Sequence, residues 1–138
     1  MALEYCSDVI ALYQNKLVLV ERLSEPKGIA LPGGRRDMIN GKLEDVASCA
    51  IREFEEETGL TLIIEGMLGR YDDLNRDPRG PKISDVVYGR AYGTLKNEPN
   101  KTKAFTIDYN KFNKYKEKFV FDHYNIINDW YKEYGGRK

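Results

Sequence analysis

The chain has 138 residues, 41% of them hydrophobic, which is enough for one compact domain spanning residues 1–138. Basic and acidic residues balance at 22 each, so no net charge recruits nucleic acid or a membrane, and we expect neither as a partner. The apolar runs are too short to cross a bilayer, and the start lacks the pattern of a secretion signal. The two cysteines, Cys6 and Cys49, form no Cys-x-x-Cys pair, which fits a reducing compartment. We therefore expect a cytoplasmic protein.

The first third of the sequence predicts strands and a loop. Residues 6–23 predict two strands joined by a turn at Gln14-Asn15, because apolar residues are dense on both sides of that dipeptide. Residues 24–34 are rich in Gly and Pro and predict a loop, with a short strand at Ile29–Leu31.

Residues 43–60 give the clearest helix. Gly59 stands where a left-handed C-terminal cap is expected. The apolar positions at helical spacing are Ala47, Ala50, Ile51 and Phe54.

The remaining sequence predicts two more strands and a second helix. Residues 60–73 and 82–95 are strand-like, with the turn-forming segment 74–81 between them. Residues 97–104 predict a loop, and residues 121–134 an amphipathic helix. The expected apolar stripe of that helix consists of Tyr124, Ile127, Trp130 and Tyr131. Together these elements predict an α/β domain, a mixed sheet flanked by two helices.

Four carboxylates occupy five consecutive positions of the first predicted helix. Each residue turns by about 100° in a helix, so Glu53, Glu56 and Glu57 converge on one stripe. Glu55 points to nearly the opposite face. Like charges at this spacing destabilise an isolated helix by roughly 0.2–0.5 kcal/mol per pair. Either the stripe is a solvated acidic face, or a divalent cation binds it, and oxygen ligands alone suit Mg²⁺ or Mn²⁺.

The residues upstream of the carboxylates complete a longer motif. The stretch ALPGGRRDMINGKLEDVASCAIREFEEETGL resembles the signature of the Nudix hydrolase family. The positions that match its spacing are Glu44, Arg52, Glu53, Phe54, Glu56, Glu57, Gly59 and Leu60. A solvated acidic helix, or one in a calcium-binding or interaction module, does not explain this combination. One departure is the interval from Gly34 to Glu44, which is ten positions where the family has six. We interpret the extra four as an expansion turned at Asn40-Gly41.

The resemblance implies a Nudix-type α/β/α sandwich that hydrolyses a nucleoside diphosphate linked to another moiety, with Mg²⁺, or Mn²⁺ in its place. It implies that Glu53, Glu56 and Glu57 are the metal ligands. Arg52 is expected to orient these glutamates by charge-assisted hydrogen bonds, and Glu44 to lie near the metal.

The resemblance also bears on the binding of substrate. It carries Gly33 and Gly34 over as substrate-binding positions, with a backbone carbonyl near Gly33 as a further metal ligand. The segment GRYDDLNRDPRGPKISDVVYG resembles the one that follows the signature in ADP-ribose pyrophosphatases. Arg76 and Arg79 would then form a basic rim for a diphosphate or ribose, with Asp77 holding one of them. Without that context the segment reads as a turn with ordinary surface charges.

The related enzymes also suggest roles for residues outside the signature. They carry an acidic pair in the loop that here holds only Glu98, which is either the catalytic base or a solvated glutamate. In the second case a signature glutamate activates the water. In the segment FVFDHYNII we expect Asp122 to cap the last helix and His123 to be structural. The candidates for stacking on adenine are Tyr71, Tyr88 and Tyr92.

The sequence therefore predicts a small-molecule nucleotide as substrate, ADP-ribose first, cleaved to AMP and ribose 5-phosphate. Two alternatives stay open, a nucleoside triphosphate pyrophosphatase that releases pyrophosphate and a non-catalytic ADP-ribose sensor. The sequence also leaves open whether the chain forms a homodimer.

Overall fold

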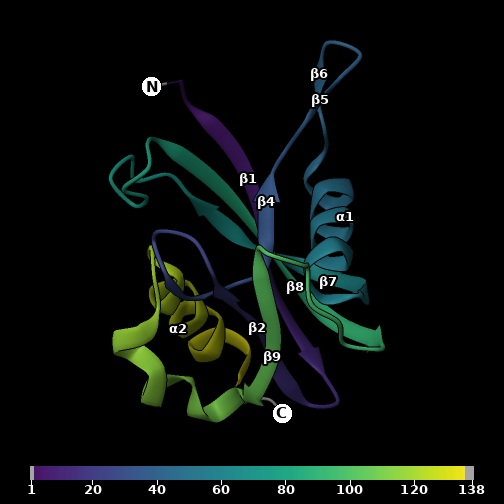
Figure 1. Ribbon diagram of the computed structural model, residues 1–138, viewed down its shortest axis with the longest axis vertical. Helices are drawn as coiled ribbons and strands as arrows, with labels where there is room; N and C mark the ends of the chain where they lie inside the picture. Colours follow the sequence, from purple (N-terminus) through teal and green to yellow (C-terminus); the bar gives the residue numbers. More distant parts are fainter. Residues whose placement is uncertain (1, 136–138) are drawn as a thin grey trace.

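The computed structural model describes residues 2–135 (Figure 1). Its helices and strands follow one another as β1 (Glu4–Tyr13), β2 (Lys16–Arg22), β3 (Gly28–Ala30), β4 (Gly33–Arg35), β5 (Met38–Ile39), β6 (Lys42–Leu43), α1 (Val46–Thr58), β7 (Leu60–Tyr71), β8 (Lys82–Gly93), β9 (Thr102–Asp108), the 3₁₀-helix η1 (Tyr109–Lys118) and α2 (His123–Tyr134). No helix within these residues is long and apolar enough to span a membrane.

The sheet is mixed, as predicted. Its main order is β3-β2-β1-β8-β7, with β4 also paired to β1 and β9 to β2. β1 pairs with β8 in parallel along the whole of β1, and the other pairs are antiparallel.

Helices cover both faces of this sheet, so the predicted α/β/α sandwich is confirmed (Figure 1). Side chains alternate between the two faces along β1. Val9 and Ala11 pack in a cluster with Phe54 of α1, whereas Ile10 and Leu12 pack in another with Trp130 of α2. Each helix thus has its own core beneath it.

The strand register divides the sheet into two parts that join at the β1–β2 turn. β2 pairs with β1 only at Leu12↔Leu17 and Tyr13↔Lys16, and β4 takes its place beside β1 further along, at Cys6 to Asp8. One part of the sheet is β9-β2-β3 and the other is β4-β1-β8-β7. The functional cleft described below is lined by residues of both parts.

The helix predicted over residues 43–60 is confirmed but shorter, Val46–Thr58, and its predicted apolar stripe holds only at Ala50 and Phe54. Gly59 ends α1 with φ 76°, the left-handed cap expected from sequence. Ala47 and Ile51 are exposed. The buried face instead carries Cys49, Ala50, Phe54 and Thr58. The last three of these are spaced by four residues, and Thr58 fits because its hydroxyl donates to the Phe54 carbonyl at 2.6 Å.

Three further segments differ from the sequence expectation or refine it. The predicted loop 97–104 ends at Thr102, where β9 begins, and the helix η1 that follows was not predicted. The four-residue expansion forms the β5–β6 hairpin, and Asn40 and Gly41 turn it with φ of 51° and 77°, as expected. In α2, Ile126 is buried together with Ile127 and Trp130, although it was not part of the predicted stripe.

Candidate active site

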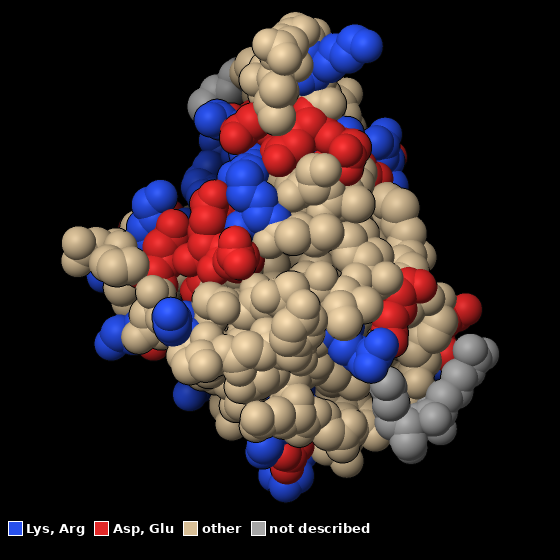
Figure 2. All heavy atoms as spheres, turned by 90° about the vertical axis from the view of Figure 1, so that its right-hand side faces the viewer, with Lys and Arg blue, Asp and Glu red and all other residues tan. Residues whose placement is uncertain are grey.

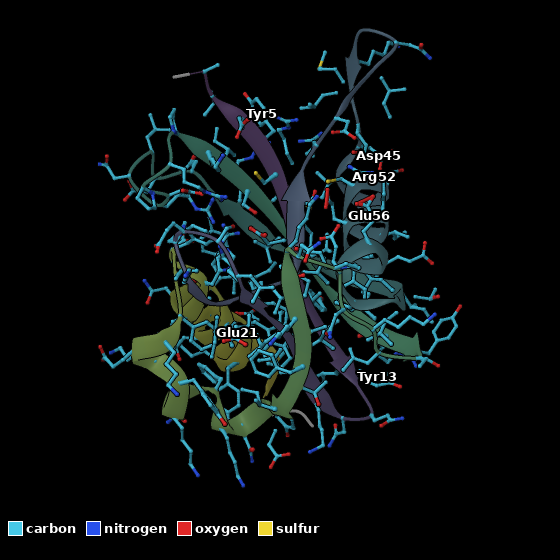
Figure 3. All side chains as sticks on the ribbon, in the orientation of Figure 1. Tyr5, Tyr13, Glu21, Asp45, Arg52 and Glu56 are labelled. Atoms are coloured by element: carbon cyan, nitrogen blue, oxygen red, sulfur yellow. The ribbon has the colours of Figure 1, made fainter. Side chains whose placement is uncertain are left out.

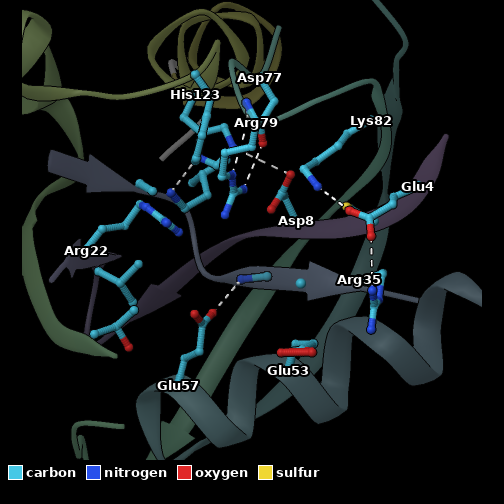
Figure 4. A pocket seen from close by; sticks show the side chains of 18 of the residues that line it. Glu4, Asp8, Arg22, Arg35, Glu53, Glu57, Asp77, Arg79, Lys82 and His123 are labelled. Atoms are coloured by element: carbon cyan, nitrogen blue, oxygen red, sulfur yellow. Dashed lines mark hydrogen bonds and ion pairs between the residues drawn. The ribbon is translucent and has the colours of Figure 1, made fainter. Parts of the chain in front are cut away.

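A cleft of about 370 Å³ lies between the two parts of the sheet and α1 (Figure 4). Glu53 and Glu57 approach it from α1, and Arg79, Asp77 and His123 lie on the opposite side. Acidic and basic side chains therefore face one another across one cavity.

The segment from Gly33 to Gly34 brings the backbone against the α1 carboxylates. The Gly33 N–H donates to Glu57 Oε1 at 2.7 Å. A methyl group on Gly34 would collide with the carboxylate of Glu53, and one on Gly33 would collide with Asp8. Gly33 requires glycine because the backbone of Ser7 and Asp8 is in the way, whereas a side chain at Gly34 would displace the Glu53 carboxylate.

One guanidinium, that of Arg52, contacts three of the signature glutamates. It donates to both carboxylate oxygens of Glu44, at 3.0 and 2.7 Å. It also donates to Glu53 Oε2 and to Glu56 Oε1, each at 3.1 Å. Arg52 and Glu56 both project from α1 (Figure 3). The hydrogen bonds to Glu44 raise the pKa of Arg52 further and, in turn, lower the pKa of Glu44. Arg52 therefore offsets the repulsion within the acidic stripe.

The signature glutamates do not all lie in the cleft. Glu53 and Glu57 line it, whereas Glu56 is 46% exposed and Glu44 is buried against Arg52 and the Asp37 N–H. Across residues 2–135, no three His, Cys, Asp or Glu side chains are grouped closely enough to hold a metal ion as they stand.

Glu57 differs from its neighbours because no cation contacts it directly among the described residues, although the charge of Arg22 acts on it across the cleft. Burial raises its pKa to about 8, against the opposing effect of the Gly33 N–H, and the charges of Glu53, Glu98 and Asp8 add to the rise. Burial also raises the pKa of Glu53, followed by the charge of Glu56. Within the described residues, Glu57 makes no ion pair. The cleft therefore contains a buried carboxylate without a cation in direct contact.

Glu98 lies near these carboxylates, since its charge contributes to the raised pKa of both Glu53 and Glu57. Its side chain is 21% exposed and 3.8 Å from Lys101 Nζ. An isolated antiparallel β-bridge pairs Glu98 with Thr102 of β9. The buried hydroxyl of Thr102 has no hydrogen-bond partner among the described residues. Glu98 is thus half-buried beside the cleft rather than fully solvated.

Arg76 does not form the expected open rim, although it lines the cleft. Its guanidinium is 4% exposed and donates to both oxygens of Asp122, at 2.9 and 2.8 Å. Asp8 lies 3.8 Å away on its other side. Asp122 precedes α2, but its side chain makes no capping hydrogen bond, so the predicted cap is wrong. Arg76 instead ties the loop before β8 to the start of α2.

Arg79 and Arg22 supply the basic side of the cleft. Asp77 holds Arg79 through two hydrogen bonds, at 3.1 and 2.8 Å, in the role expected for it. Arg22 was not predicted, and it donates only to the carbonyls of Pro26 and Glu25, at 2.8 and 3.3 Å. Its pKa is lowered by burial and then by the charge of Arg79. The only signal in the sequence is its position at the end of a strand before a Pro-rich loop.

The aromatic side chain in the cleft is Phe121, which the sequence did not single out. The guanidinium carbons of Arg79 and Arg22 lie 5.0 and 5.4 Å from its ring centroid. The three predicted stacking candidates do not line the cleft. Tyr71 donates to Asp129, Tyr88 stacks against Tyr134, and Tyr92 is exposed elsewhere.

The surface that carries α1 is mixed in charge, with acidic side chains beside basic ones (Figure 2). The positive charge in the cleft therefore comes from a few individual arginines, because the surrounding surface is not predominantly basic. Cys6 also lines the cleft, but burial raises its pKa to about 12, so its thiol stays protonated.

The NUDIX domain model matches residues 6–130, and the chain belongs to the Nudix family of pyrophosphohydrolases. These enzymes hydrolyse nucleoside diphosphates linked to another group, and generally use a divalent metal ion. Across 126 residues the chain is 37% identical to the ADP-ribose pyrophosphatase of Methanocaldococcus jannaschii, an alignment that covers 89% of this chain and 70% of that protein.

Solved structures share the fold. A bifunctional NMN adenylyltransferase/ADP ribose pyrophosphatase from Francisella tularensis, complexed with AMP and a manganese ion, gives a TM-score of 0.81 at 22% identity, over 96% of this chain. This chain spans only 42% of that enzyme. The NUDIX domain of Shewanella oneidensis NrtR, complexed with ADP ribose, gives 0.80 at 19% identity, over 96% of this chain and 89% of that domain.

The burial of Arg76 leads to a prediction about stability. Arg76→Ala should destabilise the protein by about 3–5 kcal/mol, because it leaves buried carboxylates without their cation. Arg90→Ala, which removes an exposed pair with side chains 61% exposed for Arg90 and 38% for Glu65, is the matched control and should cost at most about 1 kcal/mol. Urea denaturation followed by circular dichroism measures both. Equal losses would contradict the structural role of Arg76.

Proposed function

We propose that this chain hydrolyses ADP-ribose to AMP and ribose 5-phosphate with Mg²⁺ as cofactor, Mn²⁺ being the alternative. The observation that carries the proposal is the cleft in which Glu53 and Glu57 face Arg22 and Arg79. A diphosphate needs cations along its middle, and a metal that binds it needs carboxylates on the protein side. The 37% identity to an ADP-ribose pyrophosphatase supports this choice of substrate.

The residues of α1 fit a divalent cation by their chemistry. Glu53, Glu56 and Glu57 offer carboxylate oxygens only, the ligands that Mg²⁺ and Mn²⁺ prefer. The raised pKa of Glu57, near 8, reflects a buried carboxylate that a bound cation would stabilise in its charged form. The carbonyl of Gly33 is a further candidate ligand. In this proposal Arg52, held by Glu44, keeps Glu53 and Glu56 oriented toward the metal.

The bound metal would neutralise the diphosphate, polarise its phosphorus and lower the pKa of the attacking water. Glu98 would accept the proton of that water, since its charge acts on Glu53 and Glu57 and its one cationic neighbour among the described residues, Lys101, is 3.8 Å away and 72% exposed. Arg22 and Arg79 donate hydrogen bonds to phosphate oxygens. Gly33 and Gly34 leave room for the backbone to approach the substrate next to the carboxylates.

The first test is a substrate panel. Purified protein with Mg²⁺ is incubated with ADP-ribose, other nucleoside diphosphate derivatives and nucleoside triphosphates, and the products are separated by chromatography. We expect AMP and ribose 5-phosphate, with the highest kcat/KM for ADP-ribose. Release of pyrophosphate from triphosphates at a higher kcat/KM would favour the triphosphate pyrophosphatase. Tight binding of ADP-ribose without products would favour the sensor.

Glu57→Gln tests the metal site. It removes the charge but keeps the shape, so the fold should persist while kcat falls by roughly a hundredfold or more. Glu55→Gln, on the exposed opposite face of α1, is the matched control and should leave turnover unchanged. Steady-state kinetics over a Mg²⁺ titration measure both variants. Normal turnover and Mg²⁺ dependence in Glu57→Gln would refute its role as a ligand.

Glu98→Gln tests the base. Because the proton transfer occurs only in the transition state, kcat should fall by about a hundredfold or more while KM stays close to the wild type. The charge change Lys103→Gln, at an exposed position of β9, serves as control and should leave kcat unchanged. An unaltered kcat in Glu98→Gln would return the role of base to Glu53 or Glu56.

A further inference from the structure

The polypeptide between β3 and β4 carries the N–H group that holds Glu57. Leu31 is 3% exposed, Pro32 has no N–H, and the Gly33 N–H donates to Glu57 Oε1 at 2.7 Å. The Pro32 carbonyl accepts from the Val9 N–H at 2.9 Å. The position of the Glu57 carboxylate therefore depends on how these three residues are held.

His123, the first residue of α2, holds the start of this segment. Its Nδ1 accepts the Leu31 N–H at 2.9 Å, a buried bond between residues 92 positions apart. Because Nδ1 accepts, the neutral imidazole carries its proton on Nε2, which lies 3.5 Å from Asp8 Oδ2. A ring with a proton on Nδ1 would leave the Leu31 N–H without an acceptor, which is costly for a buried group.

The imidazole of His123 is held in place by contacts of α2 and of the sheet. The preceding residue, Asp122, accepts two hydrogen bonds from Arg76, and Ile126 packs α2 into the core with no exposed surface. On the Nε2 side, Asp8 accepts a hydrogen bond from Ser84 Oγ at 2.6 Å. Both nitrogens of the ring therefore face groups whose positions are set by the sheet and α2 (Figure 4).

We infer that His123 is a positioning residue for the active site. It fixes the Leu31 N–H and, through Pro32, the Gly33 N–H that sets the place of the Glu57 carboxylate. The inference rests on the role proposed above for Glu57. A histidine that only satisfied a buried N–H would affect stability and leave Glu57 unaffected.

The decisive experiment follows the Gly33 amide by ¹H–¹⁵N NMR in the metal-free full-length protein. Glu57→Gln provides the reference, since it weakens the Gly33 hydrogen bond directly. His123→Leu fills the space without an acceptor and should move the Gly33 resonance in the same direction. His123→Asn should restore it, because its Oδ1 can accept the Leu31 N–H. Ile126→Val, which loosens the same core cluster but keeps the His123 acceptor for the Leu31 N–H, should leave the resonance in place.

Metal affinity and kinetics provide the second readout. In His123→Leu the affinity for Mn²⁺, measured by electron paramagnetic resonance, and kcat should each fall by about 10–100-fold, with little change in KM. His123→Asn should recover both. In the wild type, imidazole ¹⁵N shifts should show the proton on Nε2, which tests the hydrogen bond even if His123→Leu does not fold.

The inference is overturned by a proton on Nδ1, by a Gly33 resonance that does not move in His123→Leu, or by a His123→Asn variant no better than His123→Leu. It is also overturned if Ile126→Val reproduces the losses. If the wild type does not cleave ADP-ribose, the proposed substrate fails, but the Gly33 resonance and Mn²⁺ affinity still decide the role of His123.

Discussion

The pair between Arg52 and Glu44 is the interaction on which the arrangement of α1 depends. Without it, the carboxylates of Glu53 and Glu56 would repel each other on one turn of helix. Arg52 donates to both of them while two hydrogen bonds to Glu44 hold its own guanidinium. Glu44 also accepts the Asp37 N–H at the base of the β5–β6 hairpin. One ion pair thus anchors both the acidic helix and the expanded loop that precedes it.

Arg52 leaves Glu57 out of this network, and that has a chemical consequence. Glu53 and Glu56 have a cation beside them, whereas Glu57 accepts from the Gly33 N–H, has Arg22 only at longer range, and has a pKa raised to about 8. A protein gains no stability from burying an uncompensated carboxylate. The arrangement is understandable if the charge of Glu57 serves the binding of a cation rather than the fold.

Sequence alone predicted what depends on local spacing. The helix, its Gly59 cap, the turn at Asn40-Gly41 and the family all follow from residues close together in the chain. The contacts of Arg22 and Arg76 could not be predicted in this way. Arg22 meets Phe121, and Arg76 meets Asp122, only because the sheet divides at the β1–β2 turn and α2 packs back onto one face of it. A basic residue in a loop gives no sign of whether it will be buried.

Arg76 and Arg79 have different roles, and this difference explains how the loop before β8 can both support the fold and bind substrate. Arg76 is fully occupied by Asp122, so it fixes the loop against α2. That leaves Arg79, held by Asp77 at 43% exposure, as the residue of the loop that is free to meet a phosphate. Phe121 lies beneath both Arg79 and Arg22, next to His123 with ring centroids 5.1 Å apart. The start of α2 therefore touches both sides of the cleft, supporting the cations through Phe121 and the Gly33 backbone through His123.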